Sequence, residues 1–401
     1  MRRRDFLALA AASVLPGCKL TIEQGLFSDC REGKALGEMP AVQAAWRGLR
    51  PERVWDVHAH LFGNGRSAGG IWVAPEFDHP TGIEARIRHA FFSNGGCVGK
   101  DEGRMDQAMV DRLVRIVSDL PPGARVMLLA FDFTYDERGA RREDLTTFSV
   151  PNRYARQVAA AHPDRFEWVA SVHPNRPDAI AELEWSKQNG ARAVKWLPPT
   201  MAIDMRSSAS LAFYDVLNRL DLPLLVHLGD EQAVAGARRH ELANPLFVRA
   251  ALDRGVRVIA AHCATLGESP DGERSGAMTP NFELFSRLMD EPAYRGRLFG
   301  DISAVTQANR GEHLASLIER SVKWEGRLLN GSDYPLPGIM PLFSMDAMVR
   351  DGVLDASVVP ELRALREVNA LLFDFTLKRH LRYRGARIPD SVFETRDFFH
   401  A

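Results

Sequence analysis

Eight short apolar segments recur along this chain, separated by segments with the spacing of amphipathic helices. Runs of this length that are apolar nearly throughout are typical of parallel strands buried on both faces. Strands that alternate with helices predict right-handed βαβ units, and eight such units predict an α/β fold of the (β/α)8 TIM-barrel type. The expected strands are 53–58, 125–131, 166–172, 193–195, 223–227, 256–262, 298–302 and 327–330.

Helices are expected between these strands, for example at 178–189, 210–220, 245–254 and 281–290. Two connections are longer than this alternation requires. The first, 61–123, contains a Gly-rich stretch at 92–100, and we expect it to form a lid or wall over the barrel mouth, because long loops in compact domains are usually functional. The second, 266–278, is rich in Gly, Asp and Ser. Residues 344–401 should supply the last helices and a C-terminal wrap.

The composition is that of an ordinary soluble globular protein. Among 401 residues there are 51 Lys and Arg against 52 Asp and Glu, and 45% of the chain is apolar. A net charge of -1 gives no reason to expect a nucleic acid, which usually requires a basic face. The sequence has no internal repeats, which excludes collagen and solenoid classes. We therefore expect a compact core and a small-molecule partner.

The first eighteen residues predict export and attachment to lipid. Arginines at 2–4 precede an apolar stretch at 6–15 that is too short to span a bilayer, for which about 20 residues are needed. The stretch RRDFL at 3–7 resembles the twin-arginine export motif. LPGC, ending at Cys18, resembles a bacterial lipobox, whose cysteine carries lipid and becomes the mature N-terminus. The two resemblances imply an exported, lipid-anchored protein on the periplasmic side of a bacterial membrane.

The expected domains follow from these boundaries. Residues 1–18 form the export signal, 19–50 a linker or collar around the barrel, and 51–401 the barrel with its C-terminal wrap. If Cys18 carries lipid, three of the four cysteines remain, so at least one thiol is unpaired in any monomeric scheme. An oxidising periplasm permits a Cys30–Cys97 bridge, although nothing in the sequence requires one. Cys263 lies in an apolar strand, where we expect a small buried thiol.

The ends of the predicted strands carry the side chains of a metal site. In DVHAH at 56–60, His58 and His60 are two residues apart on a strand, so both can face the barrel axis. His227 and His262 end the fifth and sixth strands, and Asp333 follows the eighth. Barrel enzymes place their active sites at these carboxyl ends. Several imidazoles and a carboxylate suit a divalent cation, Zn²⁺ first, with one position open to water.

At these residues the sequence resembles the amidohydrolase superfamily. More narrowly, it is similar to the amidohydrolase-related group (amidohydrolase family 2), which includes lactone hydrolases and metal-dependent decarboxylases. The resemblance covers about 51–377, and the stretch AHCATLG at 261–267 strengthens it. It implies a barrel of the metal-dependent hydrolase type. The family's metal-ligand pattern falls on His58, His60, His227, His262 and Asp333.

Chemistry assigns a role to each of these positions. A bound metal lowers the pKa of its water towards about 7, and Asp333 can accept the proton of that water and pass it to the leaving group. Whichever of His227 and His262 binds the metal less directly can orient the water or polarise the substrate. Lys195, at the end of the fourth strand, decides the metal count. As a carbamate it would bridge two ions, and as an ordinary ammonium it would accompany one, so both counts stay open.

Three further residues are candidates for substrate binding. Asp301 ends the seventh strand, where it could bind substrate or the second ring nitrogen of a ligand histidine. His173 ends the third strand, where lining the pocket and packing are both open to it. Lys100, in the Gly-rich stretch, could meet an anionic substrate.

The sequence predicts a metal-dependent hydrolase that cleaves an ester, lactone or amide bond of a small molecule with metal-activated water. A metal-dependent decarboxylase on the same barrel is one alternative, with Asp333 handling protons, and no residue separates the two reactions. A lipoprotein that binds solute or metal without catalysis is a second alternative. It would need a degenerate motif, whereas every ligand position here is filled. The oligomeric state does not follow from the sequence.

Overall fold

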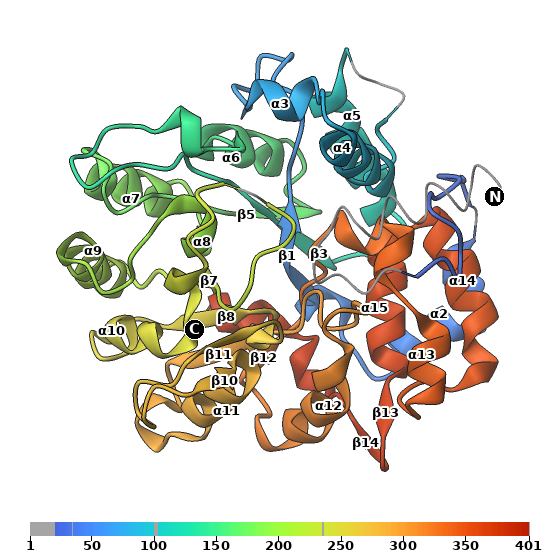
Figure 1. Ribbon diagram of the computed structural model, residues 1–401. Coiled ribbons are helices and arrows are strands. Elements are labelled where there is room, and N and C mark those ends of the chain that lie inside the picture. The colour runs from blue at the N-terminus through green and yellow to red at the C-terminus, as the bar shows by residue number, and fades with distance from the viewer. Residues whose placement is uncertain (1–20, 34, 100–102, 235, 401) are drawn as a thin grey trace. The chain divides into compact units, whose positions relative to one another are not determined.

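The computed structural model describes residues 21–400 except 34, 100–102 and 235 (Figure 1). The predicted export signal with Cys18 and the predicted substrate contact Lys100 therefore lie outside the described residues. The chain forms an α/β TIM barrel of the metal-dependent hydrolase type, as the strand and helix alternation predicts. It divides into two compact units. Unit 1 comprises Met1–Ser67, Pro75–Val126 and Ser303–Ala401, and unit 2 comprises Ala68–Ala74 and Met127–Ile302.

Unit 2 contains a run of parallel strands. Strand β7 pairs with both β6 and β8, and β8 pairs with β11. Ala170, just after β5, bridges to Val194 in β6, and Ala130 N, after β3, donates to Val169 O in β5. Both faces of these strands are buried, which is why they read as continuous apolar runs. The strands are β3 (Arg125–Leu129, whose first two residues belong to unit 1), β5 (Phe166–Val169), β6 (Val194–Trp196), β7 (Leu224–His227), β8 (Val258–Ala261) and β11 (Leu298–Asp301).

Helices connect these strands, and in Figure 1 α7, α9 and α10 lie along their outer side. Gly190 and Gly255 follow α7 and α10 with positive φ, a conformation that glycine adopts without strain. The helix expected at 245–254 is instead a 3₁₀ turn, Pro245–Val248, followed by one α-helical turn. The long connection after β8 forms a hairpin of β9 (Glu268–Pro270) and β10 (Met278–Pro280). The helices are α6 (Asn152–Ala161), α7 (Ala179–Gln188), α8 (Pro198–Met201), α9 (Ser208–Arg219), α10 (Arg249–Leu252) and α11 (Asn281–Asp290). Short strands β2 (Trp72–Val73) and β4 (Phe148–Ser149) pair antiparallel.

Unit 1 carries the first and last strands of the pattern, β1 (Trp55–His60) and β12 (Leu328–Leu329). The segment after β12 runs parallel to β1. Val57 N donates to Asn330 O, and His60 N donates to Tyr334 O. This register places residues 330–334 beside the carboxyl half of β1.

The expected collar and C-terminal wrap form one helical group in unit 1. Helix α2 (Pro40–Trp46) packs on α15 (Ala370–His380) through Trp46 and Phe375, whose rings stack with centroids 4.3 Å apart. The Gly-rich stretch begins inside α4 (Ile83–Gly95) rather than in a loop: Gly95 ends the helix and Gly96 is its C-cap. The remaining helices are α3 (Pro75–Asp78), α5 (Met105–Val117), α12 (Leu314–Lys323), α13 (Met345–Arg350) and α14 (Val359–Val368), with a short hairpin of β13 (Arg382–Tyr383) and β14 (Ala386–Arg387).

A disulfide joins Cys30 to Cys97, which is the pairing that the sequence permits. Cys30 lies in the N-terminal segment, and Cys97 lies two residues beyond α4. Asn94 reinforces this junction, because its amide accepts from Ser28 N at 2.8 Å and donates to Ser28 O at 2.9 Å. The segment before the barrel is thus attached to α4.

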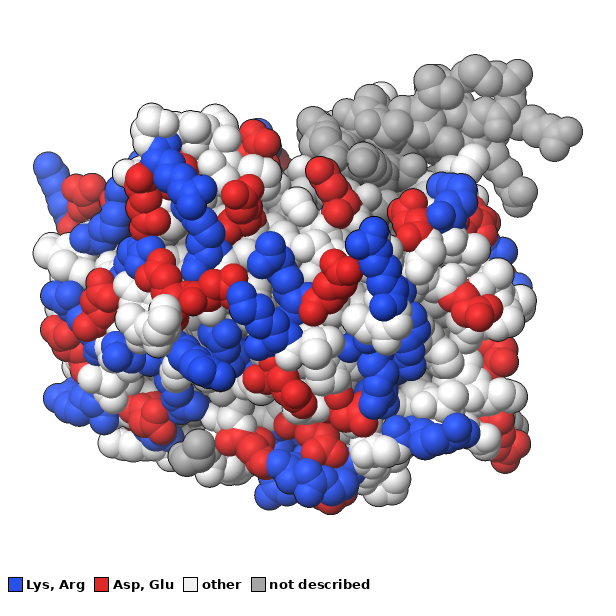
Figure 2. Space-filling model, turned by 90° about the horizontal axis from the view of Figure 1, so that it is seen from below, with Lys and Arg blue, Asp and Glu red and all other residues white. Residues whose placement is uncertain are grey.

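The molecular surface has mixed charge. On the face shown in Figure 2, Lys and Arg side chains are interspersed with Asp and Glu, in agreement with the net charge of -1. Among the described residues, no helix combines the length and the apolar character needed to cross a membrane.

Candidate metal centre

His58, His60 and Asp333 meet in unit 1, as the strand-end pattern predicts. Asp333 Oδ1 lies 3.5 Å from His58 Nε2 and 3.2 Å from His60 Nε2. One possible ligand atom from each of the three side chains lies within 4.8 Å of the others. His58 and Asp333 are buried, whereas 21% of the His60 side chain is exposed. The cluster is therefore accessible at His60.

Gly331 shapes the turn that carries Asp333. A Cβ atom on Gly331 would stand 2.9 Å from His58 Cβ, so only glycine fits this close to β1. Asp333 adopts a left-handed φ of 61°, and its N–H donates to His58 O at 2.7 Å. A left-handed backbone costs a non-glycine residue on the order of 1 kcal/mol, and Asp is among the residues that adopt it most readily.

Two buried polar residues hold His58. Asp56 accepts from His58 N at 3.0 Å and from Ser332 N at 2.9 Å, which ties β1 to the turn. Burial raises the pKa of Asp56 to about 6, although its hydrogen bonds with Ser332 and His58 oppose the rise. Ser303 Oγ lies 3.1 Å from His58 Nδ1 in a hydrogen bond, so the ring turns its Nε2 towards Asp333. Sequence reasoning gave neither Asp56 nor Ser303 a role.

His227 and His262 come together in unit 2. His227 is the last residue of β7, and His262 follows β8 directly. Their ring centroids are 5.1 Å apart in an edge-to-face arrangement. His262 N donates to Asp301 Oδ1 at 2.9 Å, which shows this fully buried carboxylate supporting the backbone of a predicted ligand.

The chain turns sharply where His262 leaves the strand. His262, Cys263 and Ala264 all have positive φ, near 50°, in succession. The placement of Cys263 in a strand was therefore wrong, because left-handed residues cannot continue a strand. Its burial is confirmed, and its thiol donates to Asp301 O at 3.1 Å.

A carboxylate missed by sequence reasoning faces His227. Glu231 Oε2 lies 3.4 Å from His227 Nδ1, and its side chain is 8% exposed. The other oxygen, Oε1, accepts from the N–H groups of Ala233 and Val234. Carboxylates that contact a histidine in this way fix the orientation of the ring. A glutamate four residues after a strand-end histidine was the available signal.

Lys195 is buried in β6, with 2% of its surface exposed. Its backbone N donates to Ala170 O at 2.7 Å, and its carbonyl accepts from Ser171 Oγ at 3.0 Å. This burial shields the Lys195 amine from solvent.

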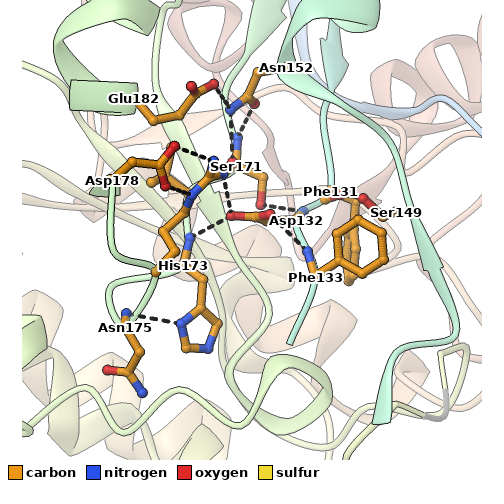
Figure 3. Close-up of polar contacts among 12 residues, drawn as sticks. Phe131, Asp132, Phe133, Ser149, Asn152, Ser171, His173, Asn175, Asp178 and Glu182 are labelled. Atoms are coloured by element: carbon orange, nitrogen blue, oxygen red, sulfur yellow. Dashed lines mark hydrogen bonds and ion pairs between the residues drawn. The ribbon is translucent and has the colours of Figure 1, made fainter. Parts of the chain in front are cut away.

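His173 binds backbone groups with both ring nitrogens, and Figure 3 shows the contact with Asn175. Its Nδ1 accepts from Asn175 N at 3.1 Å, and its Nε2 lies 3.0 Å from Met201 O. Burial lowers the pKa of His173 to about 4. Of the two roles left open for this residue, the geometry favours packing over substrate binding.

Asp132 organises the same region of unit 2. Figure 3 shows its carboxylate accepting from the backbone N–H groups of Phe133 and His173. Arg176 donates to it at 3.0 Å and also pairs with Asp178. These bonds satisfy the carboxylate within the loops after β3 and β5, so Asp132 stabilises the loops.

One family model matches most of the chain. The family model described as Amidohydrolase (Amidohydro_2) matches residues 55–339. Among solved structures, an uncharacterized TIM-barrel protein from Bordetella bronchiseptica is 15% identical, with a TM-score of 0.47, and the match covers 80% of this chain and 99% of that chain. A probable 2-pyrone-4,6-dicarboxylic acid hydrolase from Acinetobacter baumannii is 13% identical over 80% of this chain and 97% of its own, with a TM-score of 0.42. The 5-carboxyvanillate decarboxylase of Sphingomonas paucimobilis is 12% identical, with a TM-score of 0.41 and coverages of 81% and 96%. No curated protein sequence matches.

Proposed function

Because the chain belongs to the amidohydrolase family, we propose that it is a metal-dependent hydrolase cleaving an ester, lactone or amide bond of a small molecule. The observation that supports this most strongly is the cluster of His58, His60 and Asp333. Its residues come from opposite ends of the strand pattern and meet as two imidazoles and one carboxylate, with a side open at His60.

The donor atoms of this cluster fit a divalent cation. Neutral imidazoles with a carboxylate are a preferred ligand set of Zn²⁺. His58 and His60 would hold the ion together with Asp333. His227 and His262 are predicted ligands from the sequence motif, and Lys195 is predicted from its position at a strand end; this predicted set would suit one ion or two. When bound, the ion supplies Lewis acidity and lowers the pKa of a water towards about 7.

The protein's own groups would move the proton and hold the ligands. Asp333 accepts a proton from the attacking water at its carboxylate and returns it to the leaving oxygen or nitrogen. Ser303 and Asp56 keep the His58 ring and backbone in place. Glu231 holds the ring of His227, which lies at a strand end from which it can orient water or polarise a substrate oxygen.

The test is a reaction panel with an Asp333→Asn variant. Purified protein should hydrolyse at least one member of a set of esters, lactones and amides. Asp333→Asn keeps the size of the side chain and removes the base, so turnover should fall by about 10²–10⁴-fold, while metal content falls much less.

Two outcomes of the panel would contradict the proposal. Near-normal turnover by Asp333→Asn would remove Asp333 from the proton-transfer role. Release of CO2 from aromatic carboxylates, with no hydrolysis of any panel member, would assign the protein to the decarboxylases instead. Complete metal loss in Asp333→Asn would make Asp333 primarily a ligand, and the base would then have to be sought at His227 or His262.

A further inference from the structure

A buried ion pair from α15 lies beside the turn that carries Asp333. Asp374 and Lys378 are one helical turn apart, their side chains are 2% and 0% exposed, and Lys378 Nζ lies 2.5 Å from Asp374 Oδ2. Lys378 Nζ also donates to Gly331 O at 2.7 Å. Helix α15 lies beyond residues 55–339, the part matched by the family model, whereas Gly331 lies within it.

The two ends of one peptide group are held by opposite charges. The carbonyl of Gly331 and the N–H of Ser332 belong to the same planar peptide unit. Lys378 binds its oxygen at 2.7 Å, and Asp56 accepts from its N–H at 2.9 Å. A plane held at both ends cannot rotate. The next N–H along the chain is that of Asp333, which donates to His58 O. The orientation of the Gly331–Ser332 peptide plane therefore helps to set the backbone position of Asp333.

Stability alone is a poor explanation for this pair. Removing two charges from water costs several kcal/mol per ion, and replacing buried ion pairs with apolar residues is often neutral or stabilising. Asp374 Oδ1 is buried without a hydrogen-bond partner among the described residues, so its desolvation is incompletely compensated. Burying this ion pair therefore costs free energy of folding, and Lys378 contacts the backbone of Gly331, two residues before the proposed ligand Asp333.

We propose that Lys378, held by Asp374, is a positioning residue that directs the Asp333 carboxylate towards His58 and His60 through the Gly331–Ser332 peptide group. The inference rests on the metal site of the proposed function, which it deepens. A positioning role predicts that loss of the pair weakens metal binding without weakening the fold.

The experiment compares Zn²⁺ affinity and stability in the same full-length proteins. The double variant Lys378→Met/Asp374→Leu removes both charges, so no unpaired charge remains buried. Its metal-free form should unfold at or above the wild-type temperature, while Zn²⁺ affinity, measured by competition with a chromophoric chelator, should fall by about 10–100-fold, the usual effect of losing a group that orients a ligand. Lys378→Gln/Asp374→Asn keeps a neutral donor for Gly331 O and should bind Zn²⁺ close to wild type.

Arg379→Met is the matched control. Arg379 is the next residue on α15 and is also a buried cation, but it donates to Ala45 O and pairs with Asp390 instead of contacting the turn. Its loss should lower stability and leave Zn²⁺ affinity unchanged.

Three results would count against the inference, and they are distinguishable. Wild-type Zn²⁺ affinity in a folded Lys378→Met/Asp374→Leu protein would overturn it. If that variant does not fold, the other two variants decide. Equal, large losses of Zn²⁺ affinity in Lys378→Gln/Asp374→Asn and in Arg379→Met would overturn the inference, because any change in α15 would then weaken metal binding. If the wild type binds no Zn²⁺, or binds it equally after His58→Ala, the proposed metal site fails and the inference fails with it.

Discussion

At the scale of single residues, His173 shows how a buried histidine in a loop can serve the fold. Both ring nitrogens bind backbone groups, and burial lowers its pKa from 6.5 to about 4. A histidine that is neutral in the fold protonates more readily in the unfolded chain. Its contribution to stability is therefore complete above about pH 6.5 and is lost as the pH falls towards 4.

The corresponding prediction uses His173→Gln, which keeps hydrogen-bonding capacity without the titration. When the pH falls from 7 to 5, the unfolding free energy of the wild type should decrease by about 2 kcal/mol more than that of the variant. Chemical denaturation of both proteins at the two pH values measures the difference. An equal pH dependence in the two proteins would show that His173 has the same pKa in the folded and the unfolded chain.

The predictable residues of the site are those that belong to a pattern. His58 and His60 alternate on one strand, and Asp333 follows another, so strand geometry alone placed them. Ser303, Glu231 and Asp56 act through turns whose shape is set by contacts distant in sequence, as when Ser303 meets His58 245 positions away. No local periodicity carries that information.

At the scale of elements, the apolar runs predicted the strands well and their ends less well. The strands expected at 125–131 and 166–172 end at Leu129 and Val169. Beyond those ends the backbone N–H groups of Phe133 and His173 donate to Asp132 instead of continuing a strand. A hydropathy pattern does not show such side-chain contacts. Likewise, Lys378 and Asp374 stand out in the apolar sequence of α15, but their target Gly331 lies 47 positions from Lys378.

The disulfide makes a prediction about the N-terminal segment. It closes a loop between residues 67 positions apart, and disulfides typically confer about 2–4 kcal/mol by restricting the unfolded chain. Cys30→Ser/Cys97→Ser should therefore lower the unfolding free energy by that amount. A reductant should destabilise the wild type equally and leave the variant unaffected. Wild-type stability of the variant, with no response of either protein to reductant, would mean that the bridge does not form.

At the scale of the whole molecule, the alternation of strands and helices was sufficient to predict the fold class. The division of the chain into two compact units was not foreseen, because unit 1 joins residues from both ends of the chain. Contacts of that kind depend on tertiary packing, such as that of α2 on α15.

Export and lipid attachment remain proposals that rest on the motifs in residues 1–18. Lipid on Cys18 would hold the protein at the periplasmic side of the membrane, so Cys18→Ser should appear in the soluble periplasmic fraction. Fractionation of cells expressing each form measures this. Equal membrane retention of Cys18→Ser and wild type would exclude lipidation as the means of attachment.

Elemental analysis of the purified full-length protein tests the central claim most directly. The wild type should contain about one or two equivalents of a divalent metal, with Zn²⁺ first among those expected. The control variant His173→Gln removes a histidine that does not belong to the cluster, so it should contain the same amount of metal as the wild type. His58→Ala/His60→Ala removes two of the proposed ligands and should lose the metal while remaining folded. Full metal occupancy in His58→Ala/His60→Ala would contradict the account.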